Sequence, residues 1–174
     1  MSAARITPKI PVTAKSASID DRDDTADVDT SLIDSLVGYN LRRAAARQRE
    51  RFQNVFSPYD IRPVQLTALT IILHNDSLGQ SALGKALDMK RANVVKLLDE
   101  LQERGLIERK LSTRDRRAYD VHLTRKGREL TRELLSMHRK LEANLALSLG
   151  CDELKALVKL LRKFRTVDPT PELS

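Results

Sequence analysis

Apolar residues recur at helical spacing along this chain, in stretches separated by polar residues, prolines or glycines. The first stretch predicts a helix that begins near Ser31, a residue suited to the N-cap, and ends before Pro58. A second helix is expected to begin at Pro63, because proline is favoured in the first turn of a helix, and to end by Gly79. Residues 1–30 lack such periodicity and are rich in Ser, Thr, Ala, Asp and Pro, which predicts a flexible tail.

The middle of the chain predicts two helices and a hairpin. A short helix from Ser81 to about Asp88 is followed by a longer one over residues 90–104, which Gly105 ends. Such a tight connection between two helices is typical of a helix-turn-helix. Two short strands, 106–109 and 119–123, then flank a polar, basic loop, so the hairpin resembles a wing.

The last third of the chain predicts two more helices, separated at Gly150. Their apolar stripes are Leu130, Leu134, Met137, Leu141 and Leu145, and then Leu154, Leu157, Val158, Leu161 and Phe164. These stripes are longer than a small lobe needs to cover itself. We therefore expect a mainly α protein with a small β-wing: a winged helix-turn-helix lobe plus a helical dimerisation region built from both chain ends.

Composition narrows the class of protein. The chain has 174 residues, of which 41% are hydrophobic and 32% charged, as in a soluble globular domain. No apolar run approaches the roughly 20 residues that span a bilayer, and the N-terminus does not resemble a signal peptide. Cys151 is the only cysteine, and no Cys/His cluster has metal-binding spacing. We expect a cytoplasmic protein without a metal or cofactor and without a membrane partner.

The charge is unevenly distributed. The formal net charge is +7, and residues 81–128 carry 13 Lys and Arg against 7 Asp and Glu, whereas six Asp outnumber four basic residues in the first thirty. A basic middle segment is typical of a protein that binds a polyanion. A solvated charged face explains the charge alone equally well.

The order of motifs resembles the multiple antibiotic resistance regulator (MarR) family. Asp115-Arg116-Arg117, five residues, then Leu123-Thr124 and later Gly127 match the wing signature of this family, Asp-x-Arg followed by Leu-Thr. Residues 81–87 resemble its first helix-turn-helix element, and residues 94–109 its recognition helix and following strand. The resemblance covers roughly residues 31–165.

The resemblance implies a domain organisation and a function. Residues 31–166 form the family domain, with a helical dimerisation region in 31–57 and 124–166 and a DNA-binding lobe in 63–123; residues 1–30 and 167–174 are tails. Relatives are two-fold homodimers that place two recognition helices in successive major grooves, about 34–36 Å apart. The implied partner is double-stranded DNA with a palindromic operator, and a repressor is favoured over an activator.

The candidate base-reading residues lie in the first two turns of the longer middle helix: Lys90, Arg91, Asn93 and Lys96. Lys and Arg donate to guanine O6 and N7, and Asn pairs with adenine N6 and N7. A solvated helix face is the alternative. Lys90 stands where relatives usually have a capping residue, so Asp88 or the preceding backbone is an alternative cap.

The wing carries Arg114, Arg116 and Arg117 within four positions. Phosphates or a narrow, negative minor groove relieve the repulsion among such charges. Asp115 is expected to brace the hairpin; a surface ion pair between Asp115 and Arg117, of little energetic value, is the alternative.

A small-molecule effector is implied by the family, whose members commonly release DNA on binding one. Arg43, Arg47 and Arg51 form a row at four-residue spacing along the first helix, which Asn40 completes. Like charges at this spacing destabilise a helix, so the row of arginines suggests an anionic ligand. The candidate effector residues are Tyr39, Asn40, Arg43, Arg47, Arg51 and His74. Our hypothesis is an aromatic carboxylate or an acyl-coenzyme A thioester; DNA backbone, or a solvated face offset by Glu50, are the alternatives.

Three other functions have weaker support in the sequence. Cys151 at the start of the last helix suggests a redox sensor, although Asp152 and Glu153 oppose a lowered thiol pKa. A winged-helix module for protein–protein contacts would be expected to lose its basic residues. An enzyme is disfavoured, because the chain has no phosphate loop or nucleophile motif and its three histidines lie on separate predicted elements.

Overall fold

The computed structural model describes residues 29–75, 77–112 and 119–167. The chain divides into two compact units, residues 1–44 and 45–174, and the boundary falls inside helix α2 (Val37–Phe56).

The first unit shows that the helix expected from Ser31 to Pro58 is in fact two helices. α1 (Ser31–Asp34) has Ser35 as its C-cap, and α2 begins at Val37. The Asn40 side-chain amide donates to the carbonyl oxygens of Asp34 and Leu36, at 2.8 and 2.9 Å. This amide and the Ser35 hydroxyl, which donates to Leu32 O at 2.8 Å, satisfy carbonyl groups around the break. The N-cap is Thr30 rather than Ser31.

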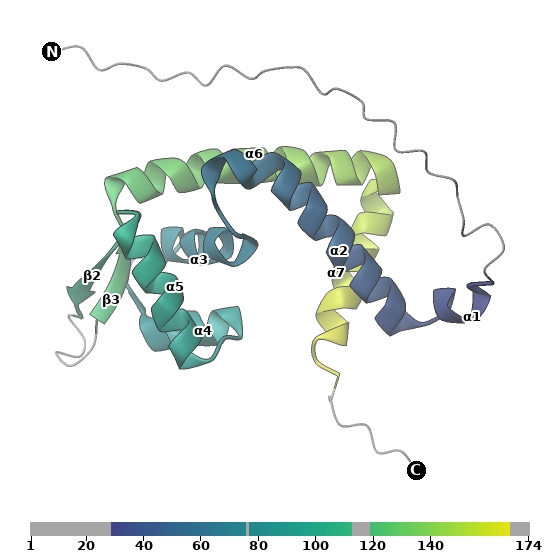
Figure 1. Ribbon diagram of the computed structural model, residues 1–174, viewed down its shortest axis with the longest axis horizontal. Helices are drawn as coiled ribbons and strands as arrows, with labels where there is room; N and C mark the ends of the chain where they lie inside the picture. Colours follow the sequence, from purple (N-terminus) through teal and green to yellow (C-terminus); the bar gives the residue numbers. More distant parts are fainter. Residues whose placement is uncertain (1–28, 76, 113–118, 168–174) are drawn as a thin grey trace, which may run out of the picture. The chain divides into compact units, whose positions relative to one another are not determined.

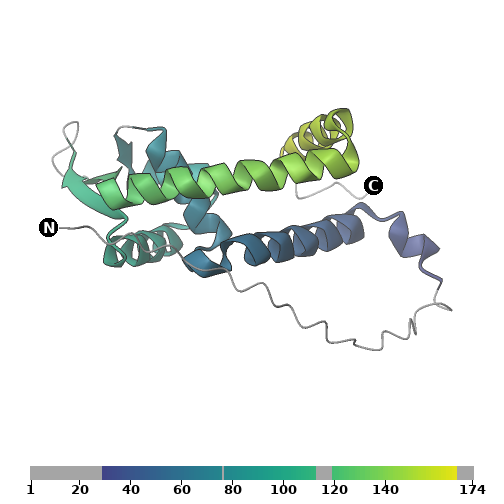
Figure 2. The same cartoon turned by 90° about the horizontal axis from the view of Figure 1, so that it is seen from above.

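The second unit contains the end of α2 and every later element (Figure 1). In chain order they are the 3₁₀ turn η1 (Ser57–Tyr59), α3 (Pro63–Leu73), β1 (Leu78–Gly79), α4 (Gln80–Leu87), α5 (Arg91–Glu103), β2 (Ile107–Leu111), β3 (Tyr119–Leu123), α6 (Arg125–Leu149) and α7 (Cys151–Phe164). Figure 2 shows the long α6 running from the sheet at one end to α7 at the other. α3 packs against both α6 and α4.

The core of this unit lies where α3, α4, α5, α6 and the sheet meet. Its largest fully buried side chains are Phe56, Leu69, Leu83, Leu98, Leu101, Leu106, Ile107 and Leu134. Leu106 and Ile107 lie at the entry to β2, and the others belong to the apolar faces of α2 to α6, whose helical spacing is why the apolar pattern located these helices.

The sheet has three antiparallel strands in the order β1-β3-β2. β2 and β3 form the predicted hairpin, with Ile107 opposite Leu123 and Leu111 opposite Tyr119. β1 was not predicted; its two residues pair with Asp120 and Val121 of β3. Two residues are too short a stretch for an alternating pattern to appear in the sequence.

The junction between the hairpin and α6 explains the Leu-Thr and Gly of the wing signature. The Thr124 hydroxyl accepts from the Gly127 N–H at 3.0 Å and donates to Gly105 O at 2.7 Å. Thr124 therefore caps α6 and ties it to the end of α5. A Cβ on Gly127 would lie 1.9 Å from Leu106 O, so only glycine allows α6 to approach the β2 entry this closely.

The fold class is confirmed: the described residues are mostly helical, with one small sheet. None of the described helices is long and apolar enough to cross a bilayer.

Candidate nucleic-acid interface and ligand cavity

Helix α5 is held by its inner face. Val94, Leu97, Leu98 and Leu101 are all buried. Gly84 on α4 permits the close crossing of α4 and α5, because a Cβ there would lie 3.1 Å from Val94 Cγ2. α5 begins after Lys90, whose side chain makes no capping hydrogen bond. The alternative cap Asp88 instead adopts a left-handed conformation, with φ of 52°, at the end of α4.

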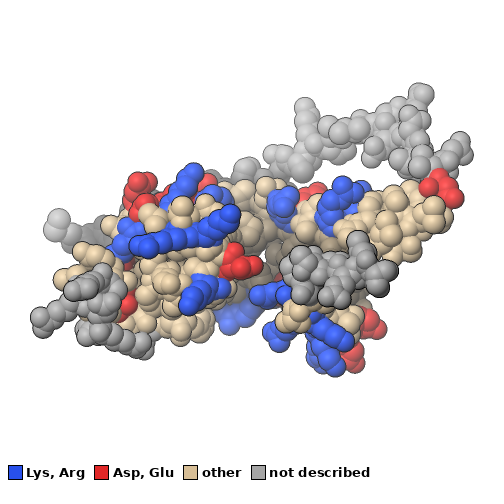
Figure 3. Space-filling model, turned by 90° about the horizontal axis from the view of Figure 1, so that it is seen from below, with Lys and Arg blue, Asp and Glu red and all other residues tan. Residues whose placement is uncertain are grey.

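The outer face of the first two turns of α5 is basic. Lys90, Arg91, Asn93 and Lys96 are all exposed, as the sequence predicts for residues that read DNA. Within the described ranges, none of the three cations among them forms an ion pair. More of the surface seen in Figure 3 belongs to Lys and Arg than to Asp and Glu.

The acidic residues of α5 lie further along the helix, and two of the three, Asp99 and Glu100, are paired. Asp99 accepts from Arg109 of β2 at 2.7 Å, and Glu100 accepts from Arg62. Both of these carboxylates thus pair with cations of other elements, and the cations at the N-terminal end of α5 stay available for an anionic partner. The Nε atom of Arg109 is buried and has no hydrogen-bond partner among the residues that the structure describes.

The predicted wing residues Arg114, Asp115, Arg116 and Arg117 lie outside the described residues. The strands that lead to them are defined: Leu111 and Tyr119 face each other across the hairpin and are 64% and 53% exposed. These apolar side chains stand on the surface beside the loop.

A cavity of about 530 Å³ lies between α2, α3 and α6. Its lining residues are Ala45, Gln48, Arg49, Phe52, Pro63, Leu66, Thr67, Thr70, Ile71, Leu135 and His138. The walls are mostly apolar, and a few polar side chains converge on them, which is typical of a site for a small organic ligand.

Arg49 and His138 are the two residues of this cavity that can carry positive charge. No hydrogen bond or ion pair to either side chain occurs within the described part of the chain. The His138 ring stacks on Phe56, with ring centroids 6.3 Å apart. The hydroxyls of Thr67 and Thr70 donate to carbonyl oxygens one turn earlier in α3, at 3.0 and 2.7 Å. The cavity therefore combines apolar walls with one guanidinium that has no partner among the described residues.

The residues predicted for an effector site are not brought together around this cavity, and none of them lines it. Tyr39, Asn40 and Arg43 belong to the first unit, where the guanidinium of Arg43 lies 5.9 Å from the centre of the Tyr39 ring. In the second unit, Arg47 and Arg51 lie on α2 and His74 follows α3. Arg47 pairs with Glu50 at 3.0 Å, Arg51 donates to Leu141 O at 3.5 Å, and His74 Nδ1 lies 2.8 Å from Thr70 O.

Sequence reasoning missed Arg49 because it followed the row of arginines at four-residue spacing. Arg49 lies one position away from Gln48 and three from Phe52, and all three line the cavity. The spacing to the buried Phe52, three residues along the helix, is the signal that could have placed Arg49 beside the core.

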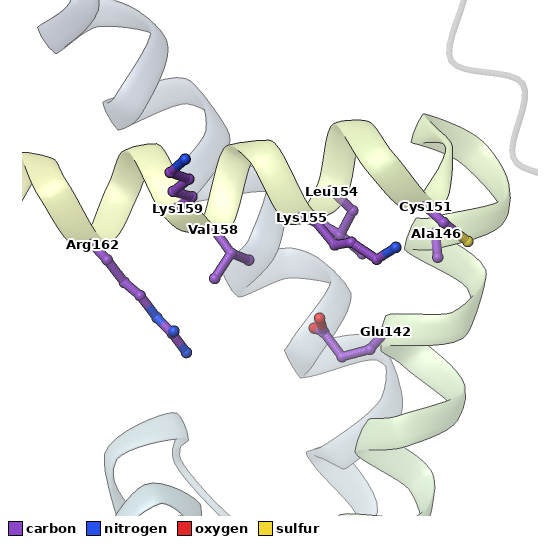
Figure 4. Close-up of a pocket in the computed structure, with 8 residues that line it drawn as sticks. All are labelled: Glu142, Ala146, Cys151, Leu154, Lys155, Val158, Lys159 and Arg162. Carbon is purple, nitrogen blue, oxygen red and sulfur yellow. The ribbon is translucent and has the colours of Figure 1, made fainter.

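A second groove, of about 600 Å³, lies in the corner between α6 and α7. Figure 4 shows Glu142 of α6 and Val158 and Arg162 of α7 projecting into this corner. Cys151 lines the groove and is exposed as a free thiol. Among the described residues, no group of three His, Cys, Asp or Glu side chains could hold a metal ion.

Comparison with known proteins decides the family. The model of the MarR family matches residues 61–119. A proposed transcriptional regulator of the hcr operon of Thauera aromatica is 32% identical over 78% of this chain and 82% of its own. The chain belongs to the MarR family. The resemblance stated from the sequence is therefore confirmed, and so is the expectation that the protein is a transcription regulator and not an enzyme.

Solved structures of MarR-type regulators agree. The transcriptional repressor CouR bound to a 23-mer DNA duplex is 30% identical, with a TM-score of 0.76 over 80% of this chain and 99% of CouR. CouR bound to p-coumaroyl-CoA is 28% identical, with a TM-score of 0.73 over 81% of this chain and 99% of CouR. The fold described above is thus a fold that binds both DNA and a small organic molecule in a relative.

Proposed function

We propose that the protein is a homodimeric repressor that reads an inverted-repeat operator with α5 and the wing and releases it on binding an anionic aromatic acid or its coenzyme A thioester. The observation that carries the proposal is the exposed cluster Lys90, Arg91 and Lys96, which has no ion pair within the described residues and stands at the start of a helix whose other face is packed in the core. A helix fixed in this way can enter a major groove without losing packing.

Phosphate and base contacts divide between α5 and the wing in this proposal. Asn93 and the cations at the start of α5 contact base edges or phosphates. Arg114, Arg116 and Arg117 contact phosphates or the minor groove, with Asp115 bracing the loop. CouR supports this part of the proposal, since it was solved on a DNA duplex.

Exposed apolar residues support the homodimer. Leu157, Leu160, Leu161 and Phe164 of α7 are each between 38% and 64% exposed, and Leu32, Leu36 and Val37 of the first unit are 54% exposed or more. Apolar stripes of this extent usually mark an interface. We propose that a second copy covers them, which leaves the α6–α7 groove at the subunit boundary.

The cavity between α2, α3 and α6 is the proposed effector site. Its apolar walls suit an aromatic ring. The Arg49 guanidinium suits a carboxylate or the phosphates of a coenzyme A thioester. Arg49 replaces the arginine row in this role, because Arg47 and Arg51 already have partners and do not line the cavity. The p-coumaroyl-CoA complex of CouR supports this class of ligand.

Fluorescence anisotropy tests the proposal. The protein is titrated into labelled DNA from upstream of its own gene and into a scrambled duplex, at two salt concentrations. We expect tight, salt-sensitive binding to the first duplex only. Equal, weak binding to both would contradict an operator and favour a protein–protein module.

The effector arm adds p-coumaroyl-CoA, p-coumarate and benzoate to the DNA complex. Release by one of them should be lost in Arg49→Met and retained when Arg43 and Arg47 are both changed to Ala. The reverse pattern would restore the arginine row as the effector site. If neither variant alters release, then neither Arg49 nor the arginine row belongs to the effector site.

A further inference from the structure

One face of helix α3 lines the cavity between α2, α3 and α6, and another face contacts α5. Pro63, Leu66, Thr67, Thr70 and Ile71 recur at helical spacing and line the cavity. Gln65 lies on another face of the same helix, is 4% exposed, and contacts α5 instead. α3 is therefore the element that separates the cavity from the DNA-reading helix.

Polar contacts fasten the start of α3 to α5. Glu100 of α5 accepts from Gln65 Nε2 at 3.1 Å and from the Arg62 guanidinium. Gln65 Oε1 in turn accepts from the Arg62 backbone N–H at 3.0 Å, which completes the cap of α3. Gln65 thus uses both ends of its amide, one on α3 and one on α5.

A second fastening lies one turn further along α5. The Arg104 guanidinium donates to the carbonyl oxygens of Asp60 and Tyr59, at 2.7 and 2.9 Å. Asp60 has a φ of 46° and closes the turn η1. Glu100 and Arg104 therefore hold residues 59–65, which comprise the end of the connection between α2 and α3 and the first turn of α3. Both helices that this connection joins line the cavity.

We propose that Glu100 and Arg104 are positioning residues that transmit the state of the cavity to the DNA-reading end of α5. A ligand that changes the spacing of α2 and α3 must shift residues 59–65, and these contacts carry the shift to α5. α5 is a helix of 13 residues, so a tilt at its C-terminal half displaces Lys90 and Arg91 at the other end. The inference rests on the proposed function only in using operator binding as one readout.

The test needs no identified ligand, because a substitution can fill the cavity. Thr70→Phe adds a ring to the cavity wall. We expect it to change the operator dissociation constant by about tenfold, within the range of typical allosteric couplings. In Glu100→Ala the same filling should change the constant by no more than about twofold, which is the signature of coupled sites in a double-mutant cycle.

Asp99→Ala is the matched control. It removes the same charge from the neighbouring position of α5 and breaks one ion pair, but that pair joins α5 to β2 rather than to the α2–α3 connection. The tenfold effect of Thr70→Phe should persist in this background. Loss of the effect in both backgrounds would show general loosening of α5 and overturn the inference, as would its persistence in Glu100→Ala.

Hydrogen exchange separates this inference from the proposed function. Amide exchange over Arg91–Glu103 is measured by mass spectrometry for the same variants, without DNA. Thr70→Phe should alter exchange in this helix in the wild-type and Asp99→Ala backgrounds but not in Glu100→Ala. An unaltered α5 in all backgrounds overturns the coupling even if the operator is bound, and the expected pattern supports it even if no operator is bound.

Discussion

Individual contacts explain why two positions of the family motif carry the residues they do. Gly127 and Thr124 are motif positions because α6 begins against the backbone of residues 105–106, with the Thr124 hydroxyl bonded on both sides. The charges of α5 likewise differ in their partners: Asp99 and Glu100 are paired, whereas the cations of the first two turns have no ion pair within the described part of the chain.

Gly127→Ala should destabilise the protein by about 2–4 kcal/mol, because the new Cβ would overlap Leu106 O and the backbone would have to move. Urea unfolding followed by circular dichroism measures the free energy of unfolding. Gly38→Ala is the control: nothing lies within 4 Å of its added Cβ, so it should be neutral or slightly stabilising. Equal effects of the two substitutions would contradict the close approach of α6.

Tyr59 makes the stability of the folded protein depend on pH. Its hydroxyl donates to Glu133 at 2.7 Å, and this hydrogen bond raises the pKa of Tyr59 above its ordinary value of 10.0. The neutral phenol is favoured in the folded state, so the stabilisation is present below pH 10 and is lost as the pH rises through the raised pKa. Ultraviolet titration of wild type against Tyr59→Phe isolates this group. Glu133→Gln should return the pKa towards its ordinary value; an unchanged titration would contradict the role of Glu133.

At the scale of elements, the sequence located what depends on local periodicity. The helices α3 to α7 and the hairpin follow from apolar spacing and from Pro63, Gly105 and Gly150. The break at Ser35 was missed, since it depends on the Asn40 amide reaching back to two carbonyl groups. The cavity was missed as well, because it brings together three helices that are distant in sequence.

Helix α5 is the element whose exposed face is proposed to bind DNA. Lys96→Ala should weaken operator binding about tenfold and reduce the slope of log affinity against log salt by about 0.9, if its ammonium contacts one phosphate. Anisotropy titrations over a salt series measure both quantities. Lys140→Ala removes an exposed cation from α6 and should change neither. Similar losses in both variants would reduce the role of α5 to net charge.

At the scale of the whole molecule, we propose that the protein acts as a homodimer. One chain leaves the apolar stripe of α7 exposed, and one recognition helix reads only half of an inverted repeat. The two features have a common explanation, because a second copy on α7 both covers the stripe and supplies the second helix.

Leu161→Glu combined with Phe164→Glu should convert the dimer to a monomer, because two charges would be buried without partners. Sedimentation velocity measures the change, and operator affinity should fall more than tenfold. Lys140→Glu, a charge change on α6, should leave the dimer intact. A double variant that remains dimeric would place the interface elsewhere.

Hydroxyl-radical footprinting on DNA from upstream of the gene tests the central claim most directly, since it records binding, register and symmetry together. The account predicts two protected half-sites on one face of the duplex, with centres about 34–36 Å apart. Lys96→Ala should need about tenfold more protein to protect both. A single protected site, or uniform weak protection along the fragment, would contradict a dimer that reads an operator with two copies of α5.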